Sequence, residues 1–214
     1  MISNVDAFSL LISDCPIVAI LRGITPDEVL PVGEALLSAG IRIIEIPLNS
    51  PEPFESIHRL AQMVGRNGLI GAGTVLTADD VANVQEAGGQ LVVSPSTDVK
   101  VIAATLKAKM VSSPGYFTPT EAFAAIHAGA HAIKLFPAEA ASPAVVKAHR
   151  AVLPSNFPLL VVGGVTAGDV PNWLSAGATG FGLGSALYRP GQSAEQVHNQ
   201  AMEFIDVLVQ WNAR

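Results

Sequence analysis

The sequence predicts an α/β fold, a TIM barrel of the (β/α)8 type in which a closed parallel sheet is preceded by an N-terminal helix. Helix-start signals recur at intervals of 20 to 27 residues, a short apolar run lies between successive helices, and several helices end in the same Ala-Gly pair. Strand–helix alternation repeated eight times is typical of a parallel sheet closed into a barrel. A chain of 214 residues fits one such domain, residues 1–214.

Each predicted helix begins near a residue whose side-chain oxygen can accept a hydrogen bond from a free N–H group of the first turn. Proline, an acid or an amide follows within that turn, where each is favoured. Glycine then supplies the left-handed residue that ends several of the helices. The predicted starts are Thr25, Ser50, Thr77, Thr97, Thr118, Ser142, Thr166 and Ser193, and the terminating glycines are Gly40, Gly88, Gly129 and Gly177.

The predicted strands are short runs rich in Val, Ile and Leu, as expected for strands that are buried on both faces. An open, doubly wound sheet is the alternative to a barrel. Its dinucleotide fingerprint, G-x-G-x-x-G after the first strand, is missing at residues 21–24. The predicted strands span residues 17–21, 41–46, 68–72, 90–94, 109–113, 132–136, 159–162 and 179–183.

Composition excludes several classes of protein. The net charge is −6 and no basic run occurs, so nucleic acid and anionic membranes are not expected partners. The charge-free run that most resembles a membrane span, residues 151–168, contains two prolines and is a poor span. Cys15 is the only cysteine, which suits a reducing cytoplasm, and we expect a cytoplasmic protein. No cluster of His, Cys and carboxylates predicts a metal site.

Two charged residues interrupt apolar strands at the rim where a barrel carries its chemistry. Side chains alternate along a strand, so Glu45 lies opposite Ile44 and Ile46, and Lys134 lies opposite its bulky neighbours. If the bulky residues face the helices, both charges point into the barrel. A buried ion pair that only stabilises the barrel is one interpretation, although such pairs contribute little. The other is a lysine nucleophile beside a carboxylate that moves protons, because burial favours the free amine.

Glycines and one arginine complete the predicted rim. The pairs Gly163-Gly164 and Gly184-Ser185 end the last two strands, where backbone N–H groups commonly bind a phosphate. The plainer interpretation is that these glycines only allow tight turns into the helices. Arg22 ends the first strand and suits a carboxylate ligand, although arginine there can also be a surface charge.

Six segments together resemble the bacterial KDPG/KHG aldolase family. The resemblance runs from about Pro16 to Gln192 and implies a (β/α)8 barrel, a class I aldolase that needs no metal or cofactor, and a homotrimer. It also implies cleavage of a phosphorylated keto-deoxy sugar acid to pyruvate and glyceraldehyde 3-phosphate. The segments are residues 20–23, 45–50, 71–74, 134–138, 162–165 and 184–185.

The resemblance also implies a role for each residue that matches a family motif. Lys134 is the Schiff-base lysine, Glu45 is the general acid and base, and Phe136 packs beside the pyruvyl group. Arg22 and Thr74 bind the pyruvate carboxylate. The phosphate cradle comprises Gly163, Gly164, Gly184 and Ser185.

Two positions point to one branch of the family. Val162 before the double glycine and Asn49 after the glutamate strand match the phosphogalactonate branch, with the arginine earlier in the chain, at Arg22. The alternatives are the C4-epimeric gluconate substrate or dual specificity. More distant alternatives are a sugar-phosphate isomerase or epimerase that uses Glu45 as base, and a sugar-phosphate sensor without turnover.

Overall fold

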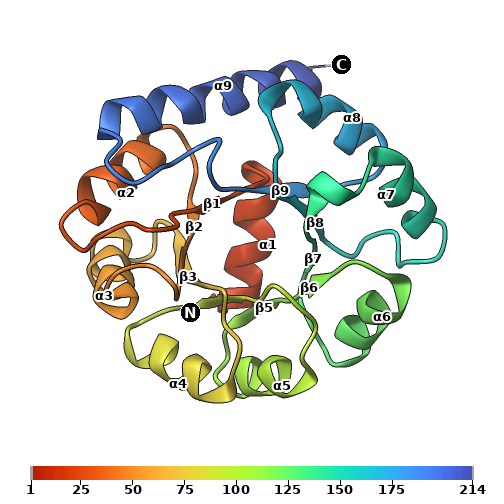
Figure 1. Ribbon diagram of the computed structural model, residues 1–214, viewed down its shortest axis with the longest axis horizontal. Helices are drawn as coiled ribbons and strands as arrows, with labels where there is room; N and C mark the ends of the chain where they lie inside the picture. The colour runs from red at the N-terminus through yellow and green to blue at the C-terminus, as the bar shows by residue number, and fades with distance from the viewer. Residues whose placement is uncertain (1, 214) are drawn as a thin grey trace.

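The computed structural model describes residues 2–213, and these form a closed ring of parallel strands surrounded by helices (Figure 1). Hydrogen-bonded neighbours follow the order β5-β4-β3-β2-β1-β9-β8-β7-β6. Each strand except the split fifth is followed by a helical segment, which confirms the predicted barrel. The strands are β1 (Ile17–Ile20), β2 (Ile43–Pro47), β3 (Leu69–Gly73), β4 (Leu91–Val93), β5 (Val111–Ser113), β6 (Gly115–Tyr116), β7 (Ile133–Leu135), β8 (Leu159–Val162) and β9 (Gly180–Leu183).

The barrel closes through a strand that proline divides. Pro114 separates β5 from β6, and β5 pairs with β4 whereas β6 pairs with β7. Proline has no N–H to donate, so regular pairing stops there. The Pro114 carbonyl still accepts a hydrogen bond of 2.9 Å from the Lys134 N–H, so the divided strand remains attached to β7 at the proline. The sequence predicted that this strand ends at Ser113, whereas the structure continues it to Tyr116.

Most of the predicted helix-start signals lie at or within a few residues of helix starts in the structure. Capping boxes form at Thr77, Thr118, Thr166 and Ser193. The helices over residues 2–213 are α1 (Asn4–Asp14), α2 (Val29–Ser38), α3 (Pro53–Val64), α4 (Ala78–Glu86), α5 (Val99–Lys107), α6 (Pro119–His127), α7 (Pro143–Arg150), α8 (Val170–Ser175) and α9 (Ala194–Asn212), with short 3₁₀ turns η1 (Ala138–Ala140) and η2 (Ala167–Asp169).

Two helix starts lie a few residues later than predicted. The signal at Thr25 leads into α2 only at Val29, because a turn comes first. In that turn the Glu28 carboxylate accepts hydrogen bonds from the Thr25 N–H and hydroxyl groups. Likewise α3 begins at Pro53, after Glu52 in a left-handed conformation. The Ser50 hydroxyl does not cap α3 but accepts a hydrogen bond of 2.9 Å from the Gly23 N–H, in the loop after β1. Both polar residues therefore satisfy backbone N–H groups outside the helix that each was predicted to start.

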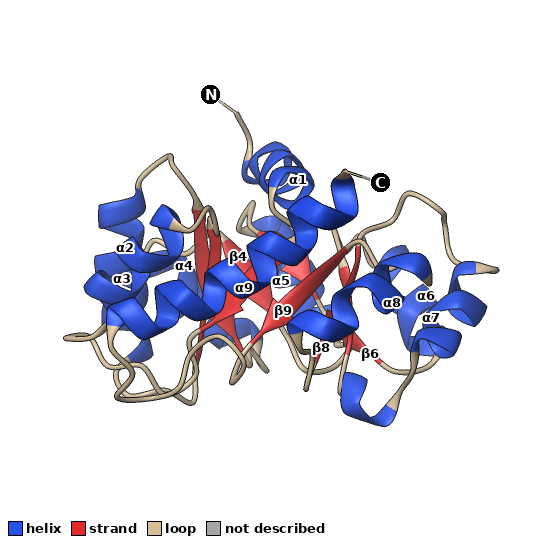
Figure 2. Cartoon of the chain, turned by 90° about the horizontal axis from the view of Figure 1, so that it is seen from above, coloured by secondary structure: helices blue, strands red, loops and turns tan. Residues whose placement is uncertain are grey.

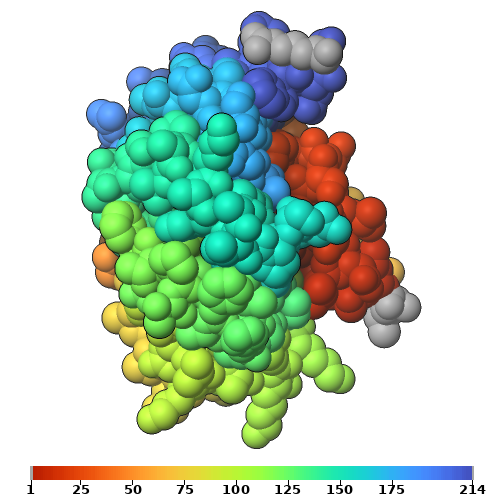
Figure 3. Space-filling view, turned by 90° about the vertical axis from the view of Figure 1, so that its right-hand side faces the viewer, coloured from red at the N-terminus to blue at the C-terminus, as the bar shows by residue number. Residues whose placement is uncertain are grey.

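The predicted N-terminal helix, α1, covers one end of the barrel. It lies across the centre of the ring in Figure 1 and at the end of the barrel in Figure 2. Its buried side chains Phe8 and Ile12 belong to the apolar cluster inside the barrel. Its outer surface is exposed on the right of Figure 3. The chemistry of the barrel must therefore lie at the other end, where the strands terminate. No helix within residues 2–213 is long and apolar enough to cross a membrane.

Candidate active site

Glu45 on β2 and Lys134 on β7 both point into the barrel. Their bulky neighbours on the strands, Ile44 and Ile133 among them, belong to the cluster between the strands and the outer helices. Ile43 and Ala132, two residues before each charge, belong to the cluster inside the barrel. Because side chains alternate along a strand, the charged side chains share the inner face. This is the orientation that the strand pattern predicted.

Burial shifts the pKa of both groups toward the neutral form. Glu45 is 2% exposed, and burial raises the pKa of its carboxyl group to about 7, against the opposing effect of Lys134 and then Arg22. Lys134 is 6% exposed, and burial lowers the pKa of its amine, which Glu45 raises and Arg22 lowers further. A carboxyl group with a pKa near 7 can both accept and donate a proton at neutral pH. The lowered lysine pKa increases the fraction of free amine, which is the nucleophilic form.

The two groups do not form a direct ion pair. Within residues 2–213 every ion pair shorter than 4.0 Å involves Arg59, on the outer surface. The Oε2 atom of Glu45 is buried and has no hydrogen-bond partner in the protein. A pair that served only to stabilise the barrel would be in contact, since unpaired buried charges are costly. The geometry therefore disfavours the structural interpretation of these residues.

Gly73, at the end of β3, makes room for the Glu45 carboxylate. A Cβ atom placed on Gly73 would overlap the carboxylate of Glu45. The next residue, Thr74, has a φ of 56°, a left-handed conformation that is rare for a β-branched residue. Such backbone strain clusters at functional sites. The family resemblance implied a role for Thr74 at the carboxylate site but none for Gly73, although the glycine belongs to the same motif.

An aromatic ring and a second glycine shape the surroundings of Lys134. The Lys134 Nζ atom lies 4.6 Å from the centroid of the Phe136 ring. This places Phe136 beside the amine, as its predicted role beside the pyruvyl group requires. On the adjacent strand Gly115 pairs with Lys134 in the sheet register. A Cβ atom on Gly115 would overlap the backbone of Pro95, so glycine at this position lets the loop after β4 approach the strand that pairs with Lys134.

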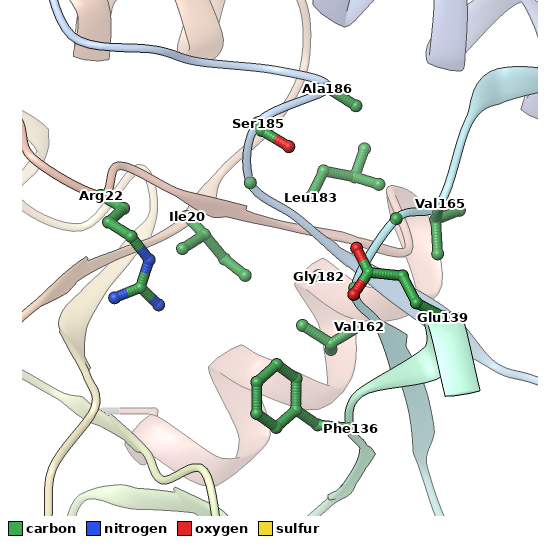
Figure 4. Close-up of a pocket in the computed structure, with 13 residues that line it drawn as sticks. Ile20, Arg22, Phe136, Glu139, Val162, Val165, Gly182, Leu183, Ser185 and Ala186 are labelled. Atoms are coloured by element: carbon green, nitrogen blue, oxygen red, sulfur yellow. The ribbon is translucent and has the colours of Figure 1, made fainter. Parts of the chain in front are cut away.

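A cavity of about 170 Å³ lies at the same end of the barrel (Figure 4). All the residues predicted to cradle a phosphate line it, and so do Arg22, Phe136 and Val162. Lys134, Glu45, Thr74 and Asn49 are not part of its wall. The predicted cradle residues are Gly163, Gly164, Gly184 and Ser185.

The double glycine after β8 is required by its backbone. Gly163 and Gly164 have φ values of 115° and 65°, which side chains rarely allow. A Cβ atom on Gly163 would lie 3.1 Å from the backbone nitrogen of Ala138. The tight turn expected by the plainer interpretation is thus present. It also brings glycine backbone to the wall of the cavity, which a phosphate site needs.

Arg22 connects the cavity to the buried pair of Glu45 and Lys134. Its Nη1 atom donates a hydrogen bond of 2.6 Å to the Oδ1 atom of Asn49, so two residues predicted to have separate roles contact each other. Arg22 also affects the pKa of both Glu45 and Lys134 through its charge. One side chain thus faces the cavity while its guanidinium acts on the buried carboxylate and amine.

Glu139 is a further charged residue at the cavity, and no sequence pattern predicted it there. It lies in η1, three residues after Phe136, and lines the cavity wall. An acid between a predicted strand and a predicted helix start has an ordinary explanation as a solvated loop residue, so the sequence contained no signal to separate it.

Comparison with known proteins places most of the chain in one family. The family described as KDPG and KHG aldolase matches residues 9–204. The chain is 47% identical over 190 residues to 2-dehydro-3-deoxy-6-phosphogalactonate aldolase of Escherichia coli (strain K12), covering 89% of this chain and 93% of the relative. It is 46% identical to a probable aldolase of the same name from Rhizobium meliloti (strain 1021), covering 87% and 88%.

A solved structure gives the same result. The structure described as native KDPGal superposes with a TM-score of 0.91 at 45% identity, covering 93% of this chain and 97% of that one. The matched segment includes both buried charges and every residue that lines the cavity. The chain belongs to the KDPG and KHG aldolase family.

Proposed function

We propose that this enzyme is a class I aldolase that cleaves 2-dehydro-3-deoxy-6-phosphogalactonate to pyruvate and glyceraldehyde 3-phosphate. The observation that carries the proposal is the buried, unpaired combination of Lys134 and Glu45, with pKa values shifted toward their neutral forms. The similarity to aldolases that act on this substrate supports the choice of substrate.

The proposed reaction begins at Lys134. The neutral amine attacks the C2 keto group, and loss of water gives an iminium ion that can accept electrons. Glu45 as carboxylate, directly or through water, removes the proton of the C4 hydroxyl group. The electrons of the C3–C4 bond move into the iminium, and glyceraldehyde 3-phosphate leaves. Protonation of the enamine at C3 and hydrolysis then release pyruvate and restore the amine, so the steps need no cofactor.

The remaining site residues are assigned to the two ends of the substrate. Arg22 and Thr74 bind the carboxylate, Phe136 packs beside the pyruvyl group, and Gly163, Gly164, Gly184 and Ser185 bind the phosphate. Arg22 lines the cavity together with the phosphate residues. Arg22 is nevertheless assigned to the substrate carboxylate, because its charge affects the pKa of Glu45 and of Lys134, where the pyruvyl end of the substrate reacts.

Two substitutions distinguish the ends of the substrate. Arg22→Ala should weaken binding of pyruvate itself by about 10-fold or more, the scale of a lost hydrogen bond to a charged group. Ser185→Ala should weaken binding of the phosphorylated substrate and leave pyruvate binding unchanged. Pyruvate affinity and KM for the phosphorylated acid measure the two effects. The reverse pattern would exchange the assignments of Arg22 and Ser185.

Substitution of Gly73 should disable the enzyme without touching a charged group. In Gly73→Ala the new methyl group overlaps the Glu45 carboxylate, which must move. We expect kcat for cleavage to fall by on the order of 100-fold, the usual contribution of a general acid or base. Steady-state pyruvate release measures it. Gly68 lies just before β3 and away from the site, and a Cβ atom there would also overlap its surroundings, at the Arg42 carbonyl group. Gly68→Ala is therefore the control for steric disruption of the strand, and equal losses of kcat in both variants would assign the effect to strand packing.

The proposed substrate is tested by side-by-side cleavage of the two C4 epimers. We expect the galactonate-configured acid to be preferred, and only modestly, because Val162 presents methyl groups to the cavity and an apolar wall discriminates weakly between hydroxyl positions. Val162→Thr should shift the ratio of kcat/KM values toward the gluconate epimer. A strong gluconate preference in the unaltered enzyme would overturn the substrate assignment. Absence of pyruvate release from either epimer would instead favour an isomerase or a sensor.

We also propose that the enzyme is a homo-oligomer, as the trimeric family members imply. Exposed apolar side chains at the rim support it. Leu76 and Phe117 lie in the loops after β3 and β6, Val99 is the first residue of α5 after β4, and they are 54%, 39% and 54% exposed in that order. Exposed apolar side chains grouped in this way mark protein interfaces. Light scattering of the purified protein is expected to give the mass of three chains.

A further inference from the structure

The cavity contains a carboxylate for which the proposed mechanism has no use. Of the residues that line it, Arg22, Glu139 and Ser185 carry polar side chains, and the others present carbon or glycine backbone. Figure 4 shows Arg22 on one wall and the carboxylate of Glu139 across the cavity, with Ser185 above them. A carboxylate beside a predicted phosphate site repels the phosphate, so its position requires an explanation.

Backbone geometry holds Glu139 in this position. Its side chain lies against Gly164, where a Cβ atom would overlap the Glu139 Cγ atom and would lie 2.9 Å from its Oε1 atom. Gly164 also has a left-handed φ of 65°. The second glycine of the pair therefore does more than permit a turn, because it leaves the space in which the Glu139 side chain lies.

The Glu139 carboxylate is available to a ligand. Within residues 2–213 it takes part in no hydrogen bond or ion pair with the protein, including Arg22 across the cavity. An ionised carboxylate has two oxygens that accept hydrogen bonds and no proton to donate. A ligand group that pairs with this carboxylate must therefore donate a hydrogen bond, as a hydroxyl group does.

We propose that Glu139 accepts a hydrogen bond from the hydroxyl group on C5 of the substrate, next to the phosphate ester, and thereby selects phosphorylated 2-hydroxyaldehydes. This assignment rests on the proposed function. There the carboxylate is assigned to Arg22 and Thr74, the C4 hydroxyl to Glu45 and the phosphate to Ser185 and the glycines. The C5 hydroxyl is left without a protein partner, and Glu139 is the remaining polar side chain of the cavity.

The consequence is a specificity for the aldehyde. A site that bonds a hydroxyl group strongly rejects the analogue without it, because the buried partner is then left unpaired. For an exposed carboxylate the effect is smaller, and a hydrogen bond to a charged group corresponds to about 10-fold or more in kcat/KM. The hydroxyl-bearing aldehyde is expected to be favoured by this factor.

The test uses the reverse reaction, with pyruvate and two acceptor aldehydes. Glyceraldehyde 3-phosphate carries the hydroxyl group, and 3-phosphooxypropanal lacks it but keeps the phosphate. The ratio of their kcat/KM values is measured for the unaltered enzyme, for Glu139→Ala and Glu139→Gln, and for Glu203→Ala. Glu203 is an exposed acid on α9 outside the cavity and serves as the control. Borohydride trapping of pyruvate, which has neither C5 nor phosphate, checks separately that the lysine chemistry is intact.

We expect Glu139→Ala to lower the preference for glyceraldehyde 3-phosphate over 3-phosphooxypropanal about 10-fold. Glu139→Gln should retain part of this preference, because its amide oxygen can still accept the hydrogen bond. Glu203→Ala should leave the preference unchanged. The inference is overturned if both Glu139 variants raise kcat/KM equally for the two phosphorylated aldehydes, since Glu139 would then only repel the phosphate. It is also overturned if the ratio stays constant in Glu139→Ala. Failure of pyruvate trapping in the unaltered enzyme would contradict the proposed function instead.

Discussion

Replacement of Lys134 by alanine is expected to abolish cleavage while the protein still folds. The variant lacks the nucleophile that forms the iminium, so kcat should fall by on the order of 10⁴-fold or more, the scale seen when a covalent nucleophile is removed. Folding should survive because burial already destabilises the charged form of this lysine, as its lowered pKa shows. Pyruvate release and thermal unfolding measure the two effects.

A surface lysine provides the control for this experiment. Lys147 lies on α7 and is exposed, so Lys147→Ala should change neither turnover nor the melting temperature by much. If purified Lys134→Ala retains turnover close to that of the unaltered enzyme, Lys134 is not the nucleophile. If instead it fails to fold, Lys134→Met, which keeps most of the side-chain length, provides the test of activity.

Glu45→Gln is expected to slow cleavage by on the order of 100-fold or more, because the amide cannot take the proton of the C4 hydroxyl group. The pH profile adds a second measurement. The carboxyl group has a pKa of about 7, so the unaltered enzyme should lose kcat as the pH falls below that value and the base becomes protonated. The glutamine variant should lack this decline. An unchanged kcat, or the same decline in the variant, would remove Glu45 from the mechanism.

The same substitution should stabilise the fold above neutral pH. Burial raises the folded-state pKa of Glu45 from its ordinary value of 4.5 to about 7, so the folded protein disfavours the ionised form. Its stability contribution is therefore fully present below about pH 4.5 and is lost as the pH rises through 7. A glutamine cannot ionise, and the melting temperature of Glu45→Gln relative to the unaltered enzyme should increase between pH 5 and pH 8.

Sequence patterns predicted the features of the site that depend on single strands. The two-residue period of a strand fixes which face a side chain occupies, so the inward direction of Glu45 and Lys134 followed from their apolar neighbours. Hydroxyl and carboxylate residues likewise indicated where helices begin, because they satisfy local N–H groups. The two late helix starts arose where such a residue accepted a hydrogen bond elsewhere, Glu28 from a turn before α2 and Ser50 from the Gly23 N–H of another loop.

Features that depend on contacts between distant loops were not predictable in this way. The hydrogen bond between Arg22 and Asn49 joins loops after β1 and β2, and no local pattern specifies how side chains of two loops meet. The placement of the Glu45 carboxylate over Gly73 depends on the register of β2 and β3. Glu139 gained its position from Gly164, which follows a different strand. Each of these is fixed only when the barrel closes.

The most direct test of the central claim, that Lys134 forms the covalent intermediate, is borohydride reduction in the presence of pyruvate followed by peptide mass spectrometry. The four other lysines, Lys100, Lys107, Lys109 and Lys147, are exposed and serve as internal controls. We expect a reduced pyruvate adduct on Lys134 alone, with loss of activity in proportion to its formation. An adduct on a surface lysine only, or no adduct in an enzyme that still cleaves the sugar acid, would contradict the assignment of this aldolase to Schiff-base chemistry at Lys134.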